Sequence, residues 1–259
     1  MLKNLLAEIG GRTVRFNIDW GVFGVLKLMS AFRFSSVLDV GSGEGEHKRF
    51  LEFFGKQVYS VDLVKDADYV GDFMDIDFGR TFDVVWCSHV LEHQRNVGLF
   101  LDKVYGLLED GGIVAISVPL HPRERLISGH LTSWSIPLLC YNLVMAGFDC
   151  SEAAILSTFE LSLIVRKRPA EFEELRKSSA HGADAGVEFA AIERFFPFPA
   201  RQGVEVPMQT AINWGDPTDY LLPAPERHGK TKIEIVSKAF RQRPELAPRI
   251  RLGAPAPVA

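Results

Sequence analysis

The sequence predicts a three-layer α/β domain whose sheet is mostly parallel, with one antiparallel strand near its edge. Short apolar runs rich in β-branched residues alternate with helix-like segments from residue 37 to residue 119, a pattern typical of βαβ units. The first run, residues 37–40, breaks into alternate glycines and then a helical pattern. Two later runs, residues 148–156 and 160–166, are joined by a short link and indicate an antiparallel pair.

The composition is that of a folded chain with a sizeable core. Of the 259 residues, 47% are hydrophobic and 24% are charged, and the formal net charge is −4, which excludes wholesale disorder. Proteins that mainly bind nucleic acid usually carry a net positive charge. Because this chain has a net negative charge, no nucleic-acid partner is expected. The three cysteines, Cys87, Cys140 and Cys150, show no metal-binding spacing and indicate free thiols in a reducing compartment.

The N-terminal region shows neither a secretory signal nor a membrane span. Its longest apolar run, residues 20–29, contains Lys27 and is too short to cross a bilayer, so a cytoplasmic protein is expected. Apolar residues at helical spacing predict a short amphipathic helix over residues 1–12 and a second helix over residues 20–32. Residues 1–36 are therefore interpreted as an N-terminal helical cap.

Residues 37–168 carry the elements of the predicted core domain. Only residues 63–69 separate the second and third apolar runs, which leaves no room for a crossover helix of a dozen or more residues. The segment Asp110-Gly111-Gly112 is expected to end a helix through a glycine cap. The remaining strands are expected over residues 58–61, 69–70, 82–87 and 113–118, and the helices over residues 47–54, 97–108 and 131–145, the last bent near Pro137.

The turn at Gly41, Gly43 and Gly45 is the most informative stretch. Glycine is needed where the backbone takes a positive φ or approaches a ligand closely, and a helix N-terminus after such a turn forms a ligand-binding corner. Asp62 ends the next apolar run, where a carboxylate can accept hydrogen bonds from ribose hydroxyls. The alternative is a structural turn beside an unrelated exposed acid. The dehydrogenase spacing Gly-x-Gly-x-x-Gly is not met, because Glu46 occupies its last position.

These motifs together resemble those of the class I S-adenosylmethionine-dependent methyltransferases, in particular the small-molecule, type 11-like members. The matching segments, in chain order, are residues 37–45, Asp62, residues 71–73, residues 82–93 and residues 107–119. The resemblance implies a Rossmann-like methyltransferase fold with a seven-stranded sheet. In this family, N-terminal helices lie over the cofactor pocket. The alternative is that they cover only the edge of the sheet.

The resemblance also implies that the chain binds S-adenosylmethionine and releases S-adenosylhomocysteine. Asp39 is expected to order the glycine turn through backbone N–H groups. The residues assigned to the cofactor are Asp39, Gly41, Ser42, Gly43, Gly45, Asp62, Leu63, Asp72, Phe73, Ser88 and His89.

Four histidines follow the ends of the fourth and fifth strands of the predicted sheet. Methyl transfer to a hydroxyl or a protonated amine requires a base, and histidine suits this role near neutral pH. His130 and His93 are the candidate catalytic residues, ahead of His121 and His89. The alternative for His93 is a structural or cofactor-side role, because the Glu-His pair recurs in the family with different acceptors. The histidines lack metal-ligand spacing, so no metal is expected.

Arg123 and Arg125 lie beside the predicted acceptor side and would suit a phosphate or carboxylate group. The alternative is a solvated loop whose arginines pair with Glu124. The predicted function is methyl transfer to an O or N nucleophile of a small molecule, with a sugar or glycan-pathway intermediate as first choice. Two rivals stay open: methylation of RNA or protein, and a partner protein that binds the cofactor without catalysis.

Residues 169–259 form a C-terminal extension without clear periodicity, and the resemblance does not reach it. A homodimer contact or a lid is one interpretation of its aromatic and proline-rich segment. The expected parts are a charged helix over residues 171–177, a polar loop over 178–186, the aromatic and proline-rich segment at 195–199, a strand or helix over 233–240, and a poorly ordered tail from Arg241.

Overall fold

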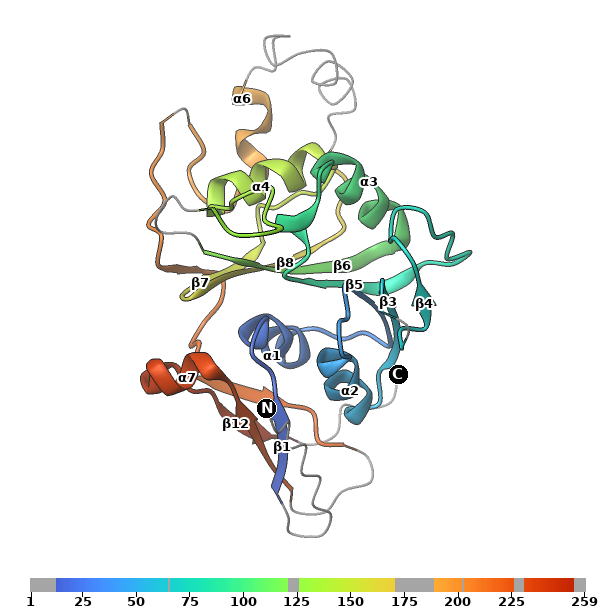
Figure 1. Ribbon diagram of the computed structural model, residues 1–259. Helices are drawn as coiled ribbons and strands as arrows, with labels where there is room; N and C mark the ends of the chain where they lie inside the picture. The colour runs from blue at the N-terminus through green and yellow to red at the C-terminus, as the bar shows by residue number, and fades with distance from the viewer. Residues whose placement is uncertain are drawn as a thin grey trace.

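The computed structural model is organised around one large sheet, with helices on both faces and smaller strands beneath (Figure 1). No helix in the described part of the chain is long and apolar enough to cross a bilayer. The predicted helix over residues 1–12, the charged helix over 171–177 and the polar loop over 178–186 lie outside the described residues. The structure describes residues 13–64, 66–120, 126–170, 189–201, 203–225 and 231–253.

In these residues the large sheet has eight strands in the order β4-β3-β2-β5-β6-β8-β7-β9. The strands from β4 to β6 pair in parallel, whereas β8 is antiparallel to both β6 and β7. The predicted mostly parallel α/β sheet is therefore confirmed. The strand bounds are β2 Ser36–Val40, β3 Gln57–Asp62, β4 Tyr69–Val70, β5 Phe82–Ser88, β6 Leu108–Pro119, β7 Ala154–Ser157, β8 Glu160–Arg166 and β9 Thr210–Ile212. Strand β9 comes from the C-terminal extension, pairs antiparallel with β7, and was not predicted.

Helices cover both faces of this sheet and bury its central strands β2, β5 and β8 almost completely. Helices α1 (Val22–Ala31) and α2 (Glu46–Phe53) lie on one face, and α3 (Val97–Leu107) and α4 (Ile136–Met145) lie on the other (Figure 1). Successive residues of a strand point to opposite faces, so the apolar strands feed two separate cores. A sheet buried on both faces is expected to have continuous apolar strands rather than alternating ones.

Two expected helix boundaries differ from the structure. Helix α4 begins at Ile136 rather than near residue 131, because Pro137 occupies the first turn and Ser135 caps the helix through the N–H of Leu138. Pro137 therefore starts the helix and does not bend it. The glycine cap expected at residues 110–112 is wrong as well. Helix α3 ends at Leu107, and residues 110–112 lie in an irregular stretch of β6.

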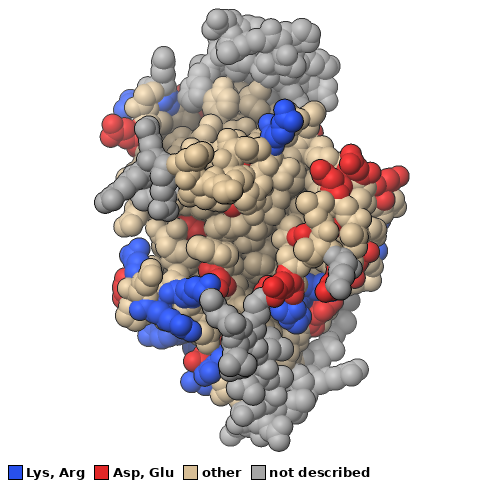
Figure 2. Space-filling view, in the orientation of Figure 1, with Lys and Arg blue, Asp and Glu red and all other residues tan. Residues whose placement is uncertain are grey.

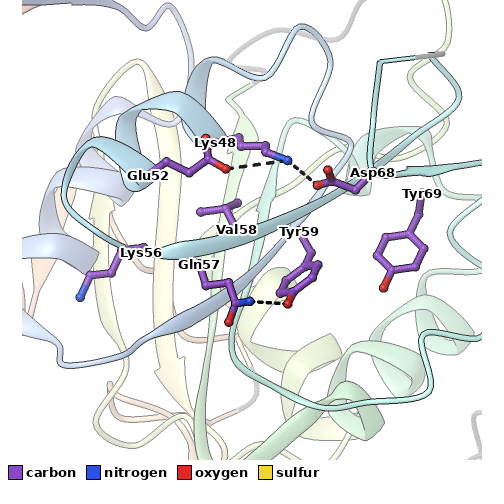
Figure 3. Close-up of a pocket in the computed structure, with 8 residues that line it drawn as sticks. All are labelled: Lys48, Glu52, Lys56, Gln57, Val58, Tyr59, Asp68 and Tyr69. Carbon is purple, nitrogen blue, oxygen red and sulfur yellow. Dashed lines mark hydrogen bonds and ion pairs between the residues drawn. The ribbon is translucent and has the colours of Figure 1, made fainter.

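The expected absence of a crossover helix after β3 is confirmed for the described residues of that link. Asp68 instead accepts the backbone N–H of Ser60 at 2.7 Å and pairs with Lys48 of α2. Beside this ion pair lies an open cavity of about 550 Å³ (Figure 3). Its lining includes Gln57 and Val58 from the amino half of β3. The cavity therefore lies away from the carboxyl ends of the strands, where ligands of such sheets bind.

The two terminal regions pair with each other beneath α1 and α2 (Figure 1). Strand β1 (Thr13–Asn17) runs parallel to β11 (Lys232–Val236), and β10 (Asp219–Leu222) runs parallel to β12 (Arg249–Leu252). Phe16 of β1 packs edge-on against Phe50 of α2, with ring centroids 5.1 Å apart. The poorly ordered tail expected from Arg241 is wrong for residues 241–253, which form the end of α7, η3 and β12.

The shorter elements complete the chain. Both alternatives for residues 233–240 occur, since β11 is followed directly by α7. Within the aromatic and proline-rich segment, Phe195 and Phe196 are buried in the core beside Tyr141 of α4. Interpretation of the rest of that segment as a lid or a dimer contact stays a prediction. The remaining bounds are η1 Leu91–His93, α6 Phe189–Ile192, η2 Glu193–Phe195, α7 Lys238–Gln242 and η3 Pro244–Leu246.

Candidate functional site

The glycine turn joins β2 to α2 with three residues in the left-handed region. The φ angles are +71° at Gly41, +53° at Gly43 and +73° at Gly45, which L side chains rarely adopt. The Gly41 N–H donates to the carbonyl of Val61 on β3 at 2.9 Å, and the Gly45 N–H donates to the carbonyl of Ser42 at 2.9 Å. The turn therefore lies against the end of β3 and presents the first turn of α2.

Asp62 connects the end of β3 to this turn. Its Oδ2 accepts the Gly43 N–H at 2.7 Å, and its Oδ1 accepts the Val64 N–H at 3.1 Å. Each carboxylate oxygen has a second lone pair for a ligand hydroxyl. A Cβ added to Gly43 would meet no atom within 4 Å, and the adjoining Leu63 is 76% exposed. The corner thus combines the hydrogen-bond acceptors of Asp62, open space at Gly43 and the exposed apolar side chain of Leu63.

Asp39 lies beneath the turn and is only 1% exposed. Burial, helped by the nearby charge of Asp62, raises the pKa of Asp39 to about 7, although the Lys48 backbone N–H opposes this shift. Its Oδ2 has no hydrogen-bond partner among the described residues. The expected ordering of the turn through backbone N–H groups therefore stays a prediction.

His89 follows β5 with a φ of +57° and lies between two buried carboxylates. Its Nε2 is 3.2 Å from Glu160 Oε2, and its Nδ1 is 3.3 Å from Glu92 Oε1. Burial disfavours the imidazolium, but the hydrogen bonds and charges of the two glutamates outweigh burial and raise the pKa of His89 to about 9. His89 is therefore protonated at neutral pH.

The start of α1 completes this part of the site. The Trp20 ring lies 4.7 Å from the His89 ring, and the Gly21 N–H donates to Glu160 at 2.8 Å. The helix itself packs on the sheet face at β6 and β8, so it does more than cover an edge. The predicted site did not include Glu160 or Trp20. The signal in the sequence was a lone acid at the start of the apolar β8 strand.

His93 and His130, the two candidate bases, lie next to each other beyond the carboxyl ends of β5 and β6 and together form a histidine rim. Their ring centroids are 5.0 Å apart and the rings are nearly perpendicular. His93 Nδ1 lies 2.7 Å from the carbonyl oxygen of Gly129. The structure thus brings together two side chains that are 37 positions apart in the sequence, one after β5 and the other after β6.

The other residues that the sequence assigns to the site have surroundings unlike those of the glycine turn and the histidines. Phe73 is 7% exposed and packs in the core against Phe78 and Phe100, with ring centroids 5.8 and 4.9 Å away. Asp72 Oδ1 accepts the Met74 N–H at 2.9 Å. Ser88 Oγ is buried without a hydrogen-bond partner among the described residues. His121, Arg123 and Arg125 lie outside the described residues.

These side chains gather where the strand order reverses. Strands β3 and β5 flank β2, and the turns after β2 and β5 touch, because a Cβ on Gly41 would lie 2.3 Å from Val90 Cγ2. Open α/β sheets bind ligands at such a switch point. The site therefore offers a corner with hydrogen-bond acceptors on the β3 side and a histidine rim on the β6 side.

Replacement of Gly41 by alanine is expected to lower the free energy of unfolding by about 2 kcal/mol. The left-handed φ costs about 1–2 kcal/mol for an L side chain, and the contact with Val90 adds overpacking. Urea denaturation would measure the loss. Gly43→Ala has the same φ penalty but no neighbour within 4 Å, so it should lose less. Equal losses in the two variants would contradict the close packing at Val90.

A family model and a curated relative are similar to parts of this chain. Residues 22–150 match a family model described as a methyltransferase domain. A segment of 43 residues is 42% identical to a ubiquinone biosynthesis O-methyltransferase of Nitrobacter winogradskyi, and the match covers 17% of this chain and only 16% of that protein.

Two solved structures are similar over about half of the chain. One is a 1,6-didemethyltoxoflavin-N1-methyltransferase of Burkholderia thailandensis, at 24% identity and a TM-score of 0.45, covering 52% of this chain and 72% of that one. The other is an amino pentose methyltransferase of Micromonospora echinaspora, at 15% identity and a TM-score of 0.46, covering 57% and 89%.

Proposed function

Because residues 22–150 belong to the family of S-adenosylmethionine-dependent methyltransferase domains, we propose that the chain transfers a methyl group from this donor to a small molecule. The observation that carries the proposal is the corner at Gly43, where the Asp62 carboxylate lies 2.7 Å from the backbone N–H of the turn. An O or N nucleophile is the proposed acceptor atom.

The residues present fit the donor. Gly43 borders open space that a Cβ would enter without contact, and Leu63 is 76% exposed beside it, so a flat apolar group can cover this side chain. Asp62 offers lone pairs for ribose hydroxyls. Asp39, Ser42, Ser88 and the other assigned residues are proposed to complete the pocket. Phe73 contributes through the core that it packs in.

S-adenosylmethionine, when bound, supplies a reactive methyl group on a positively charged sulfur. The protein has to align an acceptor and, where the acceptor is a hydroxyl or a protonated amine, remove a proton. His89 is already protonated at neutral pH, because its pKa is raised to about 9, so it is a poor base. This favours His93 or His130 at the rim as the base.

A small acceptor is also favoured by the surface charge. On the face drawn in Figure 2, basic side chains gather around α7 and acidic ones beside β4, so a phosphate backbone would meet charges of both signs there. An anionic sugar or a glycan-pathway intermediate is the proposed first acceptor class. The proposal takes this class from the family resemblance.

Calorimetric titration of the chain with S-adenosylmethionine and S-adenosylhomocysteine tests the proposal. Binding at the micromolar level, about −8 kcal/mol, is the expected result. It would justify a screen of acceptors, in which unchanged turnover in both His93→Ala and His130→Ala would remove the two histidines as candidate bases. No heat of binding with either ligand would overturn the proposal.

A further inference from the structure

Two segments of the histidine rim are tied together by their backbones. The Glu92 carbonyl in η1 accepts the N–H groups of Leu131 at 2.7 Å and Thr132 at 3.2 Å. The Thr132 hydroxyl donates to the Leu91 carbonyl at 3.2 Å. The side chains carried by these segments are therefore held at a fixed distance from one another.

Three of these side chains converge on one point. Ligand atoms of Glu92, His93 and His130 all lie within 4.8 Å of one another. The carbonyl oxygen of Gly129 can only accept a hydrogen bond, so the His93 Nδ1 that lies 2.7 Å from it carries the proton. His93 Nε2 therefore keeps its lone pair and lies 3.8 Å from Glu92 Oε1. A histidine whose second nitrogen donates to a carbonyl is the usual arrangement of a metal ligand.

Glu92 supplies an independent observation. Its side chain is 1% exposed, and beyond the 3.3 Å contact with His89 neither carboxylate oxygen has a hydrogen-bond partner among the described residues. A buried carboxylate with so few partners is costly. Its close contact is with His89, which Glu160 also contacts. A bound cation would give the buried Glu92 oxygens a partner that they lack among the described residues.

We infer that Glu92, His93 and His130 form a binding site for a divalent transition-metal ion of the zinc type. Two imidazoles and one carboxylate are a ligand set that such ions accept, with a further position left open. Bonds of about 2.0–2.1 Å in a tetrahedron place ligand atoms about 3.4 Å apart, so small side-chain movements would close the site. Sequence spacing did not indicate it, because the ligands come from two distant segments.

A position left open on the bound ion would be available to an acceptor at the histidine rim. A metal-bound hydroxyl loses its proton to solvent more readily, so with the ion bound His93 and His130 would act as its ligands and not as free bases. This role rests on the proposed function, whereas binding of the ion does not.

Titration of the metal-free full chain with Co²⁺, followed by visible absorption, tests the site. We expect uptake of one equivalent with a new absorption band, and affinity at least about 10-fold lower in His93→Ala and His130→Ala. His47→Ala, which removes a described histidine that contacts the Trp20 carbonyl and the Trp86 ring rather than the cluster, should bind Co²⁺ as the original chain does. Glu92→Gln is a further test, with its fold checked by circular dichroism because Glu92 is buried.

Two outcomes would overturn the inference: no absorption band with the original chain, or equal Co²⁺ affinity in His93→Ala and His47→Ala. Calorimetry with S-adenosylmethionine on the same proteins separates the two proposals. Retained S-adenosylmethionine binding together with lost Co²⁺ binding in His93→Ala supports the metal site. Co²⁺ uptake by a chain that binds no S-adenosylmethionine would support the metal site and contradict the proposed function.

Discussion

Asp62→Ala is expected to lose at least about 100-fold in affinity for S-adenosylmethionine. Hydrogen bonds to a charged group contribute about 1.5–3 kcal/mol each, and the carboxylate can accept two from a ribose. The variant also removes the acceptor that lies 2.7 Å from the Gly43 N–H, so the turn loses one of its links to β3. Calorimetry on the original chain and the variant measures the change.

Two further variants serve as controls for the affinity measured with Asp62→Ala. Asp62→Asn keeps one oxygen acceptor of the same shape and should lose less affinity than Asp62→Ala. Asp66→Ala removes an exposed carboxylate from the same link and should bind as the original chain does. If Asp62→Ala bound S-adenosylmethionine with unchanged affinity, the donor would not lie in this corner.

Asp39→Asn is expected to change how the stability of the protein depends on pH. In the folded protein burial raises the pKa of Asp39 to about 7, from its ordinary value of 3.8. The folded state therefore holds this proton more tightly than the unfolded state does. Its contribution is fully present below pH 3.8 and is lost as pH rises to about 7, a total of about 4 kcal/mol. The variant cannot ionise and lacks this loss.

Urea denaturation of both proteins between pH 4 and pH 8 measures this effect. The free energy of unfolding of Asp39→Asn minus that of the original chain should rise with pH and become constant above about pH 7. Other titrating groups contribute to both curves and cancel in the difference. Asp66→Asn is the surface control. A difference that stays constant over this range would show that Asp39 ionises normally in the folded protein.

Local chemistry explains which parts of the site were predictable. The three glycines need a left-handed backbone whatever surrounds them, and Asp62 follows an apolar run by one residue, so short windows of sequence contain both signals. Glu160 depends on a partner 71 positions away, since it lies 3.2 Å from the ring nitrogen of His89. No periodicity records such a contact, and a single acid at the start of a strand has many possible roles.

The fold also contains some elements that the sequence predicts and others that it does not. The apolar runs of β2, β5 and β6 are buried on both faces, so composition alone identifies them. Strand β9 has three residues and β1 has five, which is too little pattern to separate from a loop. Phe73 was assigned to the cofactor from its place in a motif. An aromatic neighbourhood formed by Phe78 and Phe100 instead buries its side chain, and only the tertiary structure brings these rings together.

The pairing of β1 with β11 has a consequence for how the chain folds. Thr13 lies opposite Lys232, a separation of 219 positions, so this ladder forms only after residues 232–236 have been synthesised. Contacts of such long range close the largest loops and slow the folding of a domain. Until residues 232–236 emerge from the ribosome, the edge of β1 that pairs with β11 has no strand partner. The order of synthesis therefore makes the terminal ladder a late event, and a chain truncated before residue 232 would leave β1 as an open edge prone to self-association.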